Sequence, residues 1–180
     1  MSDAYASLSG RPGFLIRRLH QIHLALFAEE CAVFGVTPVQ YSIMTAVAAR
    51  PGLDQVALAL EVGVDRTTMA DVLGRLEGRG LVRRGGSAGD RRVKLVTPTA
   101  EGTRLLARMD GPARRAHERT VEALPVEDRA LFAGFLRVLV DAGNGFGRAP
   151  MRAASLSESL PGRVASKGQA AQAGGRKRAP

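Results

Sequence analysis

The 180-residue sequence has no tryptophan and a single cysteine, Cys31, and aromatic residues make up only 4% of it. A lone cysteine excludes an intrachain disulfide framework and an all-cysteine metal site. Hydrophobic residues nevertheless make up 45% of the chain, as in an ordinary globular protein. The core must therefore rely on leucine, valine, alanine and methionine, and the length predicts one domain.

Long apolar runs are also missing, since none approaches the roughly 18 residues of a membrane-spanning helix. Residues 1–4 lack the basic start of a signal peptide, so we expect a cytoplasmic protein. The sequence shows no nucleophile elbow, no phosphate-binding loop and no recognisable pair of carboxylates. It therefore predicts no enzyme, no catalytic residue and no cofactor.

The net charge of +9 is concentrated in two segments. Residues 144–180 carry a net charge of +6, from seven basic residues and one acidic residue. Residues 75–94 carry +5, from seven basic and two acidic residues, and the rest of the chain is slightly acidic. A basic segment on a nearly neutral body is the electrostatic footprint of a protein that binds a polyanion.

Apolar residues at helical spacing predict a series of helices. The first covers residues 14–34, and the second opens at Thr37 with a proline at its first position and ends near residue 50. Two short helices follow, from Leu53 and from Asp65, with a turn at Gly63 between them. A long helix from about residue 99 to 123, kinked at Pro112, and a last helix over about 126–142 complete the series.

The two short helices fit a helix-turn-helix, in which the first braces the second and the second enters the DNA major groove. The second would turn Met69, Val72, Leu73 and Leu76 inward. Its exposed N-terminal end would carry residues able to contact phosphates or base edges, namely Arg66, Thr67, Thr68, Ala70 and Asp71, with Arg75 further along. The alternative is an ordinary surface helix.

Two short β-type runs, residues 81–83 and 93–96, flank a Gly-rich segment that predicts an exposed hairpin loop over residues 84–92. Four arginines lie at its base or within it: Arg83, Arg84, Arg91 and Arg92. A slim loop of this kind can place an arginine in the minor groove, where the potential attracts it. Asp90 could hold one of these arginines through an ion pair. A plain surface turn would show mixed charge instead.

Residues 76–84 (LEGRGLVRR) and 90–102 (DRRVKLVTPTAEG) together resemble the MarR family of transcription regulators, and the helix order matches from about residue 13 to 142. The resemblance implies a mainly α fold with a small β wing, in which a winged helix-turn-helix lobe joins a helical dimerisation region. The expected parts are an N-terminal arm (1–13), a DNA-binding and dimerisation domain (14–143) and a basic disordered tail (144–180). Within the domain, the winged helix covers about 53–98 and the dimer helices about 14–35 and 99–142.

The resemblance also implies a homodimer on double-stranded DNA. It matches Asp90 and Arg92 to the family's wing pair, with Arg92 in the minor groove and Arg91 on a phosphate. Arg84 is also expected to contact DNA. Thr67, Thr68 and Ala70 match positions that face the major groove. Asp71 departs from the pattern, because many members have arginine there. It either reads a different base or orients Arg66 or Arg75.

Family members commonly respond to a small molecule, often an aromatic acid. Ile16, His20, His23 and Phe27 share one face of the first helix by spacing, with Arg17 and Arg18 in the same turn. These residues, together with Met44, form the expected effector site: Phe27 would stack on an aromatic acid or its coenzyme A thioester, a histidine would bond a phenol, and an arginine would bind the carboxylate. The alternative is that they belong to the core, the dimer contact and the solvated surface.

Other hypotheses remain open on the sequence. A redox sensor would need a reactive thiol, but Cys31 lies near the C-terminal end of the first helix, where the helix dipole raises a thiol pKa. A metal sensor would need ligands from His20, His23, Glu30, Cys31 and His117, which show no spacing typical of a metal site, so we predict none. A non-specific DNA-binding or scaffold protein would depend on the basic tail.

Overall fold

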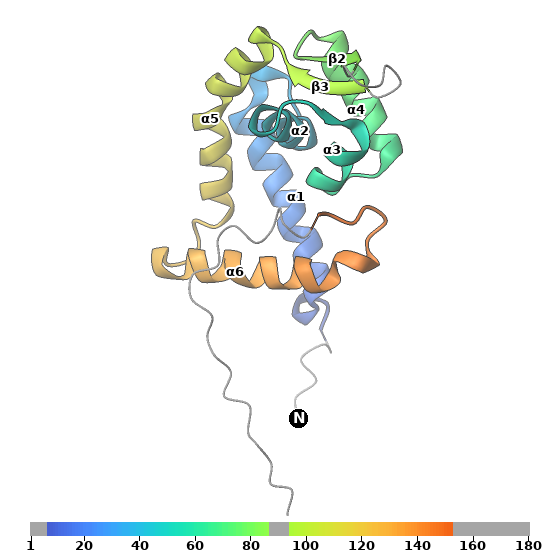
Figure 1. Cartoon of the computed structure of the whole chain (residues 1–180). Coiled ribbons are helices and arrows are strands. Elements are labelled where there is room, and N and C mark those ends of the chain that lie inside the picture. The colour runs from blue at the N-terminus through green and yellow to red at the C-terminus, as the bar shows by residue number, and fades with distance from the viewer. Residues whose placement is uncertain (1–6, 87–93, 153–180) are drawn as a thin grey trace, which may run out of the picture.

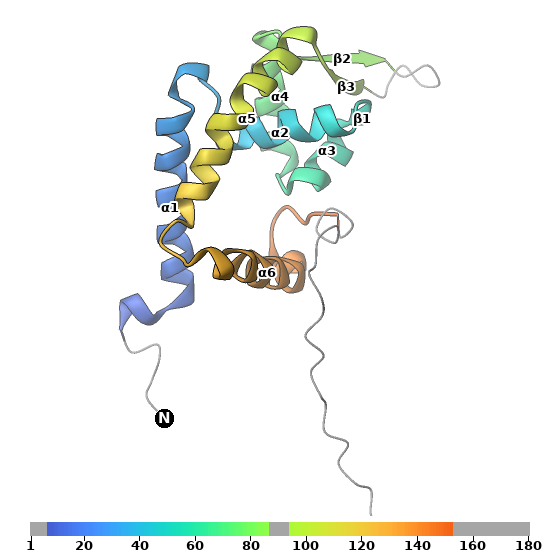
Figure 2. The ribbon, with the colours of Figure 1, turned by 90° about the vertical axis from the view of Figure 1, so that its left-hand side faces the viewer.

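The computed structural model of the chain describes residues 7–86 and 94–152. Three long helices, α1 (Pro12–Glu30), α5 (Ala100–Thr120) and α6 (Val126–Gly143), accompany a smaller lobe. Figure 1 shows α1 and α5 running alongside each other, with the lobe at one end and α6 crossing at the other. Figure 2 shows the same pairing of α1 with α5 from the side. The mainly α fold with a small β wing is confirmed.

The lobe contains α2 (Pro38–Ala49), α3 (Gln55–Val62), α4 (Arg66–Gly78) and a small antiparallel sheet. Its strands β1 (Leu53–Asp54), β2 (Val82–Gly86) and β3 (Lys94–Pro98) lie in the order β1-β3-β2. Leu53 pairs with Val96 of β3, so these first residues form a strand where the sequence predicted the start of a helix. The cause is tertiary, because the third strand offers a free edge that the local pattern does not reveal.

Local chemistry explains where the helices begin. Thr37 and Gln40 form a reciprocal capping box at the start of α2, which also has a proline in its first turn. Asp54, Asp65 and Thr99 cap α3, α4 and α5 through their side chains. These starts agree with the predicted caps at residues 37 and 65. Helix α5 continues through Pro112 and ends at Thr120, about one turn earlier than predicted.

The core lies where α1, α5 and the lobe meet. Its largest fully buried side chains come from α2, α3, α4 and β3 of the lobe and from the long helices α1 and α5: Phe27, Ile43, Val47, Leu58, Met69, Leu73, Leu76, Val96 and Met109. Helix α6 is different, because none of its residues is buried among the described part of the chain. Most of its apolar side chains are therefore exposed in one protomer.

Two boundaries differ from the sequence-based expectation. Strand β2 extends to Gly86, which pairs with Lys94, so the hairpin loop is shorter than residues 84–92. After α6 a short 3-10 helix, η3 (Asn144–Phe146), leads the chain back to α3. Residues 144–152 thus adopt a defined conformation, whereas the sequence predicted disorder from residue 144 onward. The N-terminal residues 1–6 and the predicted tail from 153 onward lie outside the described residues.

Candidate nucleic-acid interface and adjoining cavity

Helix α4 has the two faces predicted for a recognition helix. Met69, Val72, Leu73 and Leu76 are its buried residues, as the spacing indicated. Arg66, Thr67, Thr68, Asp71 and Arg75 are exposed, and Ala70 is half-buried. The exposed side chains therefore gather at the N-terminal end, which is the end that favours a phosphate.

Asp65 fixes the start of this helix. Its carboxylate accepts the backbone N–H of Thr68 at 3.0 Å and the hydroxyl of Thr68 at 2.6 Å. These bonds hold the pKa of Asp65 below its usual value. Because the Thr68 hydroxyl donates to the cap, it meets DNA only as an acceptor or through its methyl group. Thr67 contributes to this cap through its backbone alone among the described hydrogen bonds.

Asp71 was predicted either to read a base or to orient Arg66 or Arg75, and the structure bears on the second alternative. Among the residues that the structure describes, no ion pair joins Asp71 to Arg66 or Arg75. An orienting role for Asp71 therefore has no support in the unbound protein. Its exposed carboxylate leaves direct contact with a base edge as the remaining interpretation.

The wing is fastened to α4 at its root. The Arg84 guanidinium pairs with the Glu77 carboxylate, with a distance of 2.8 Å from Nε to Oε2, and the Arg84 backbone N–H donates to the other oxygen at 3.1 Å. Arg83 donates to the Thr97 hydroxyl across the hairpin at 3.0 Å. Arg84, predicted as a DNA contact, thus joins β2 to the recognition helix. The predicted wing residues Asp90, Arg91 and Arg92 lie outside the described residues.

The wing root is also packed against α5 without room for a side chain. A Cβ on Gly102 would lie 1.9 Å from the backbone oxygen of Leu81. Thr99, the cap of α5, donates its hydroxyl to the Gly80 carbonyl at 2.6 Å. A displacement of α5 therefore moves the base of the wing directly.

A cavity of about 440 Å³ lies between the long helices and the lobe. Its walls are mostly apolar, with a few hydroxyl, imidazole and carboxylate groups, and come from α1, α2, α3, α5 and the segment after α6: His23, Phe27, Pro38, Tyr41, Ser42, Thr45, Ala46, Ala49, Glu61, Val62, His117 and Met151. A molecule bound in this cavity would touch both the long helices and the lobe that carries α4.

Aromatic rings form one end of this cavity. Tyr41 lies against Phe27 with ring centroids 5.7 Å apart, and His23 stacks on His117 at 5.0 Å. Burial raises the pKa of Tyr41, so its hydroxyl stays protonated and able to donate. The cavity thus presents flat apolar surfaces beside hydrogen-bonding groups, which is the chemistry that suits a small aromatic molecule.

Among the residues that the structure describes, the hydrogen bonds around His23 determine which ring nitrogen is left to accept a bond. The Thr120 hydroxyl donates its single proton to the Ala116 carbonyl at 2.7 Å. His23 Nδ1 lies 2.9 Å from that hydroxyl oxygen and must therefore be the donor to it. In neutral His23 the proton is on Nδ1, and Nε2 is an acceptor. Such a nitrogen accepts from a phenolic hydroxyl.

The expected effector residues are only partly brought together. His23 and Phe27 line the cavity, whereas Arg17, Arg18, His20 and Met44 do not. Arg17 stacks on Phe14, and Arg18 donates to Gln21. Helix α5 ends at Thr120, level with His23, so the earlier residues of α1 extend beyond the cavity.

Met44 belongs to the core rather than to the cavity. It is 3% exposed and faces a separate, much smaller space beside Leu81 and Leu106. The sequence also missed Tyr41, Thr45, His117 and Met151. Tyr41 and Thr45 are four residues apart and so share a face of α2, but nothing local shows that this face borders a cavity.

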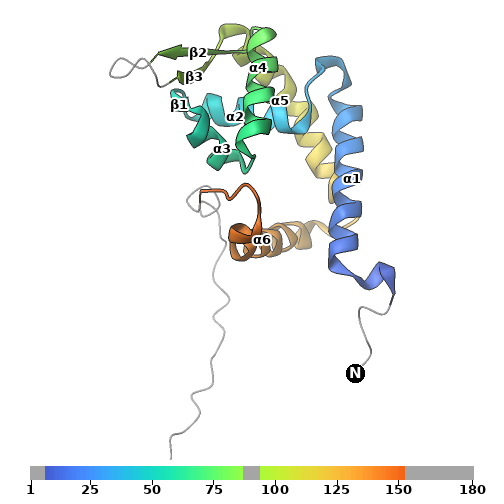
Figure 3. The same ribbon diagram turned by 90° about the vertical axis from the view of Figure 1, so that its right-hand side faces the viewer.

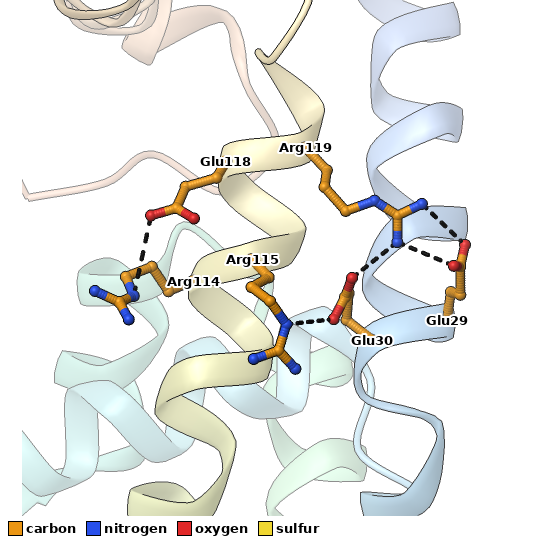
Figure 4. Close-up of polar contacts among 6 residues, drawn as sticks. All are labelled: Glu29, Glu30, Arg114, Arg115, Glu118 and Arg119. Carbon is orange, nitrogen blue, oxygen red and sulfur yellow. Dashed lines mark hydrogen bonds and ion pairs between the residues drawn. The ribbon is translucent and has the colours of Figure 1, made fainter.

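Ion pairs join α1 to α5 (Figure 4). Arg119 donates to Glu30 at 2.8 Å and to Glu29 at 3.0 Å, and Arg115 donates to Glu30 at 2.8 Å. Hydrogen bonds from Arg119 and then Arg115 lower the pKa of Glu30. Arg114 and Glu118 lie on the exposed side of α5 and do not reach α1 (Figure 4).

The alternatives of redox and metal sensing gain no support from this geometry. Cys31 is buried, and burial raises the pKa of its thiol, whereas a reactive cysteine needs a thiolate. Within residues 7–86 and 94–152, no group of three or more His, Cys, Asp or Glu side chains is placed to hold a metal ion. None of the helices in these ranges is long and apolar enough to cross a membrane.

Comparison with known proteins identifies the family. A model described as the MarR family matches residues 34–93. Transcriptional regulator HosA from Escherichia coli O157:H7 is 36% identical over 126 residues, which are 70% of this chain and 92% of HosA. The chain belongs to the MarR family. It is therefore a transcriptional regulator with a winged-helix DNA-binding fold.

Solved structures of other MarR-family proteins extend this likeness. The PcaV regulator from Streptomyces coelicolor, in complex with its natural ligand, is 33% identical with a TM-score of 0.69, over 77% of this chain and 97% of PcaV. The repressor CouR on a 23-mer DNA duplex is 30% identical with a TM-score of 0.71, over 75% and 96% of the two chains. CouR from Rhodococcus jostii RHA1 has also been solved with p-coumaroyl-CoA, at 29% identity and a TM-score of 0.64, over 74% and 94%.

Proposed function

We propose that this MarR-family chain is a homodimeric repressor of a palindromic operator, and that a small aromatic acid or its coenzyme A thioester releases it from DNA. The observation that carries the effector part is the cavity between α1, α2, α3 and α5, which combines stacked aromatic rings with the free Nε2 of His23. The DNA part rests on the exposed N-terminal end of α4 beside the fastened wing.

The homodimer is supported by apolar surface that one protomer leaves uncovered. Helix α6 exposes most of its apolar side chains, including Phe135 at 58%, Val138 at 57% and Leu139 at 61%. An apolar groove between α6 and α1 is lined by Leu15, Ile22 and Leu136, among others. Contiguous apolar surface of this kind marks an interface. A second copy would cover it by symmetric packing of α1 and α6.

DNA contact is assigned to the exposed end of α4 and to the wing. Arg66 and Thr67 would reach the major groove, with Asp71 reading a base edge and Arg75 near the backbone. The phosphate and minor-groove contacts would come from Arg91 and Arg92. The structure of CouR bound to a DNA duplex supports this assignment by analogy, because this chain is 30% identical to CouR with a TM-score of 0.71.

The effector class follows from the lining of the cavity. Volumes of roughly 300–1,000 Å³ are usual for small-molecule sites, so this cavity suits a compact ring. A phenolic hydroxyl would donate to His23 Nε2, and Phe27 and Tyr41 would hold the ring. The complexes of PcaV with its natural ligand and of CouR with p-coumaroyl-CoA support an aromatic acid or its thioester.

No lysine or arginine lines the cavity among the described residues. A carboxylate would therefore bond to Tyr41, Ser42 or Thr45 or extend toward the opening. Arg17 and Arg18 remain candidates for binding it only if the dimer brings a second α1 to the opening. A coenzyme A thioester would place its acyl group inside and leave the nucleotide outside.

The proposal is tested with the full-length protein in two steps. Selection from a random duplex library should enrich a palindrome whose half-sites lie about one helical turn, roughly 34 Å, apart. Arg92→Ala should then weaken binding of that palindrome while the dimer stays intact. A single non-symmetric half-site, or equal loss of specific and random DNA binding as salt rises, would instead indicate a non-specific polycation.

The second step adds 4-hydroxybenzoate, p-coumarate, their coenzyme A thioesters and benzoate to the operator complex. At least one phenolic compound should dissociate the complex and raise the melting temperature of the free protein. Benzoate, which lacks the hydroxyl donor, should act more weakly. If none of the compounds changes either measurement, the assignment of the effector class is wrong.

A further inference from the structure

The segment after α6 turns back onto the DNA-reading lobe. We name residues 147–152 the C-terminal strap; Figure 3 shows it rising from the end of α6 toward α3. Asn144 holds it at its root, because its amide donates to the Met151 carbonyl at 2.8 Å and accepts the Met151 N–H at 2.7 Å. The Arg152 N–H then donates to the Leu60 carbonyl of α3 at 2.8 Å. Three hydrogen bonds therefore position residues 147–152, although their sequence shows neither helical nor strand periodicity.

The strap lies over the turn between α3 and α4. Gly63, which ends α3 with a φ of +69°, faces it so closely that an added Cβ would lie 2.5 Å from Met151 Cγ and 3.0 Å from Sδ. On one side, the Met151 side chain lines the large cavity. On the other side, Arg148 and Pro150 border a second hollow with Asp65 and Arg66, at the start of the recognition helix.

We propose that the C-terminal strap is the closing wall of the effector cavity and that Met151 is the residue that sets which aromatic effectors fit. Among the described residues that line the cavity, Met151 is the one that no helix carries. A methionine side chain has three rotatable bonds and a polarizable sulfur that packs well against ring edges. It therefore fits a compact single ring and limits the space for a larger one.

This inference rests on the proposed effector function and makes it more specific. The walls from α1, α2 and α5 belong to helices that contribute buried side chains to the core, whereas no residue of the strap is buried among the described residues. Within those residues, three hydrogen bonds hold the strap, so its position responds to what fills the cavity. A larger effector that displaces Met151 also displaces Arg148 and Pro150, which border Arg66.

The experiment compares two probes by calorimetry, 4-hydroxybenzoate with one ring and 6-hydroxy-2-naphthoate with two. Met151→Ala should weaken binding of the one-ring probe by about two- to tenfold, the range expected for a lost sulfur–aromatic contact. It should strengthen binding of the two-ring probe, which gains the vacated space. The ratio of the two affinities is the diagnostic quantity, because general destabilisation changes both in the same direction.

A matched pair of glycine variants tests the strap without touching its own residues. Gly63→Ala and Gly35→Ala both place alanine at a left-handed position, with φ of +69° and +58°. A Cβ at Gly63 meets Met151, whereas a Cβ at Gly35 has only the Arg79 guanidinium at 3.9 Å. Gly63→Ala should therefore displace Met151 and change the affinity ratio, and Gly35→Ala should leave the ratio unchanged.

Amide hydrogen exchange of the strap gives a readout that needs no effector. Asn144→Ala removes both bonds to Met151 and should speed exchange of residues 147–152 at least about threefold, given the usual strength of such bonds. Gln21→Ala, which removes an amide that accepts from Arg18 on the surface of α1, should not. If the wild-type protein binds neither probe, the effector function fails and the role of Met151 fails with it. If it binds both but the ratio stays constant in Met151→Ala and Gly63→Ala, only the strap inference is overturned.

Discussion

The imidazole of His23 on α1 lies flat against that of His117 on α5, with ring centroids 5.0 Å apart and planes inclined by 19°. This contact joins the two long helices at the point where they border the cavity. Burial is the main cause that lowers the pKa of His23, followed by the charges of His117 and His20. The folded protein therefore favours neutral His23, with Nε2 free to accept a hydrogen bond.

The lowered pKa predicts how stability depends on pH. Below about pH 6.5 the unfolded chain binds a proton at His23 that the folded chain resists. The free energy of unfolding should therefore fall as pH decreases through 6.5, until the lower pKa of the folded state is reached. His23→Gln should reduce this slope in urea titrations between pH 5 and 8. His20→Gln, at an exposed position of the same helix, should change it less; equal slopes in wild type and His23→Gln would contradict the account.

The uncovered face of α6 predicts that one charge there disrupts assembly. Val138 is 57% exposed in one protomer, and burying glutamate at that position in a symmetric interface costs several kcal/mol unless the charge is paired. Val138→Glu should raise the dimer dissociation constant about 100-fold or more, measured by analytical ultracentrifugation. Val33→Glu makes the same change at a position that is 86% exposed and away from α6. It should remain dimeric; dissociation of both variants, or of neither, would place the interface elsewhere.

The ion pair between Arg84 of the wing and Glu77 of the recognition helix predicts that a substitution at Glu77 moderately changes DNA affinity. Glu77→Gln removes the charge that holds Arg84, so the wing root is less fixed before binding. Operator affinity should fall about two- to fivefold, the factor that corresponds to an exposed ion pair, in fluorescence anisotropy. Glu101→Gln breaks a comparable ion pair with Arg104 on α5 and should leave affinity unchanged. A rise in affinity for Glu77→Gln would mean that Arg84 is withheld from DNA rather than positioned for the wing.

Two glycines of α5 should respond in opposite directions to alanine. At Gly102 the new Cβ would overlap the Leu81 backbone oxygen, so Gly102→Ala should lower the unfolding free energy by about 2–3 kcal/mol. At Gly111 the nearest atom is a flexible Arg115 nitrogen at 3.6 Å. Gly111→Ala should therefore add about 0.5–1 kcal/mol through helix propensity. Urea midpoints at one fixed protein concentration check both, and a similar sign for the two variants would contradict the close packing at the wing root.

Sequence was sufficient for the recognition helix because its signals are local. Asp65 caps the helix that it precedes, and the four inward side chains follow from spacing alone. The formation of β1 and the extension of β2 to Gly86 both depend on pairing with β3. Hydrophobic periodicity within one segment does not reveal such pairing. Local patterns therefore gave the helices more accurately than the small sheet.

The cavity was harder to predict because it is formed by separate elements. His23 and Phe27 were found through their shared face on α1, but the same reasoning included His20 and Arg17, which lie beyond the end of α5. His117 joins the site only through packing of α5 against α1. Met151 lies in a segment rich in glycine, alanine and proline. Its backbone is held by the side chain of Asn144, a contact that no hydrophobic periodicity predicts.

The uncovered helix α6 also has a consequence for gene dosage. If DNA binding requires two copies, operator occupancy depends on the concentration of pairs rather than of chains. Well below the dissociation constant of the pair, halving the amount of protein leaves about a quarter of the pairs. Small changes in expression would then be amplified into larger changes in repression, and the strength of the α6 contact sets the cellular level at which this amplification begins.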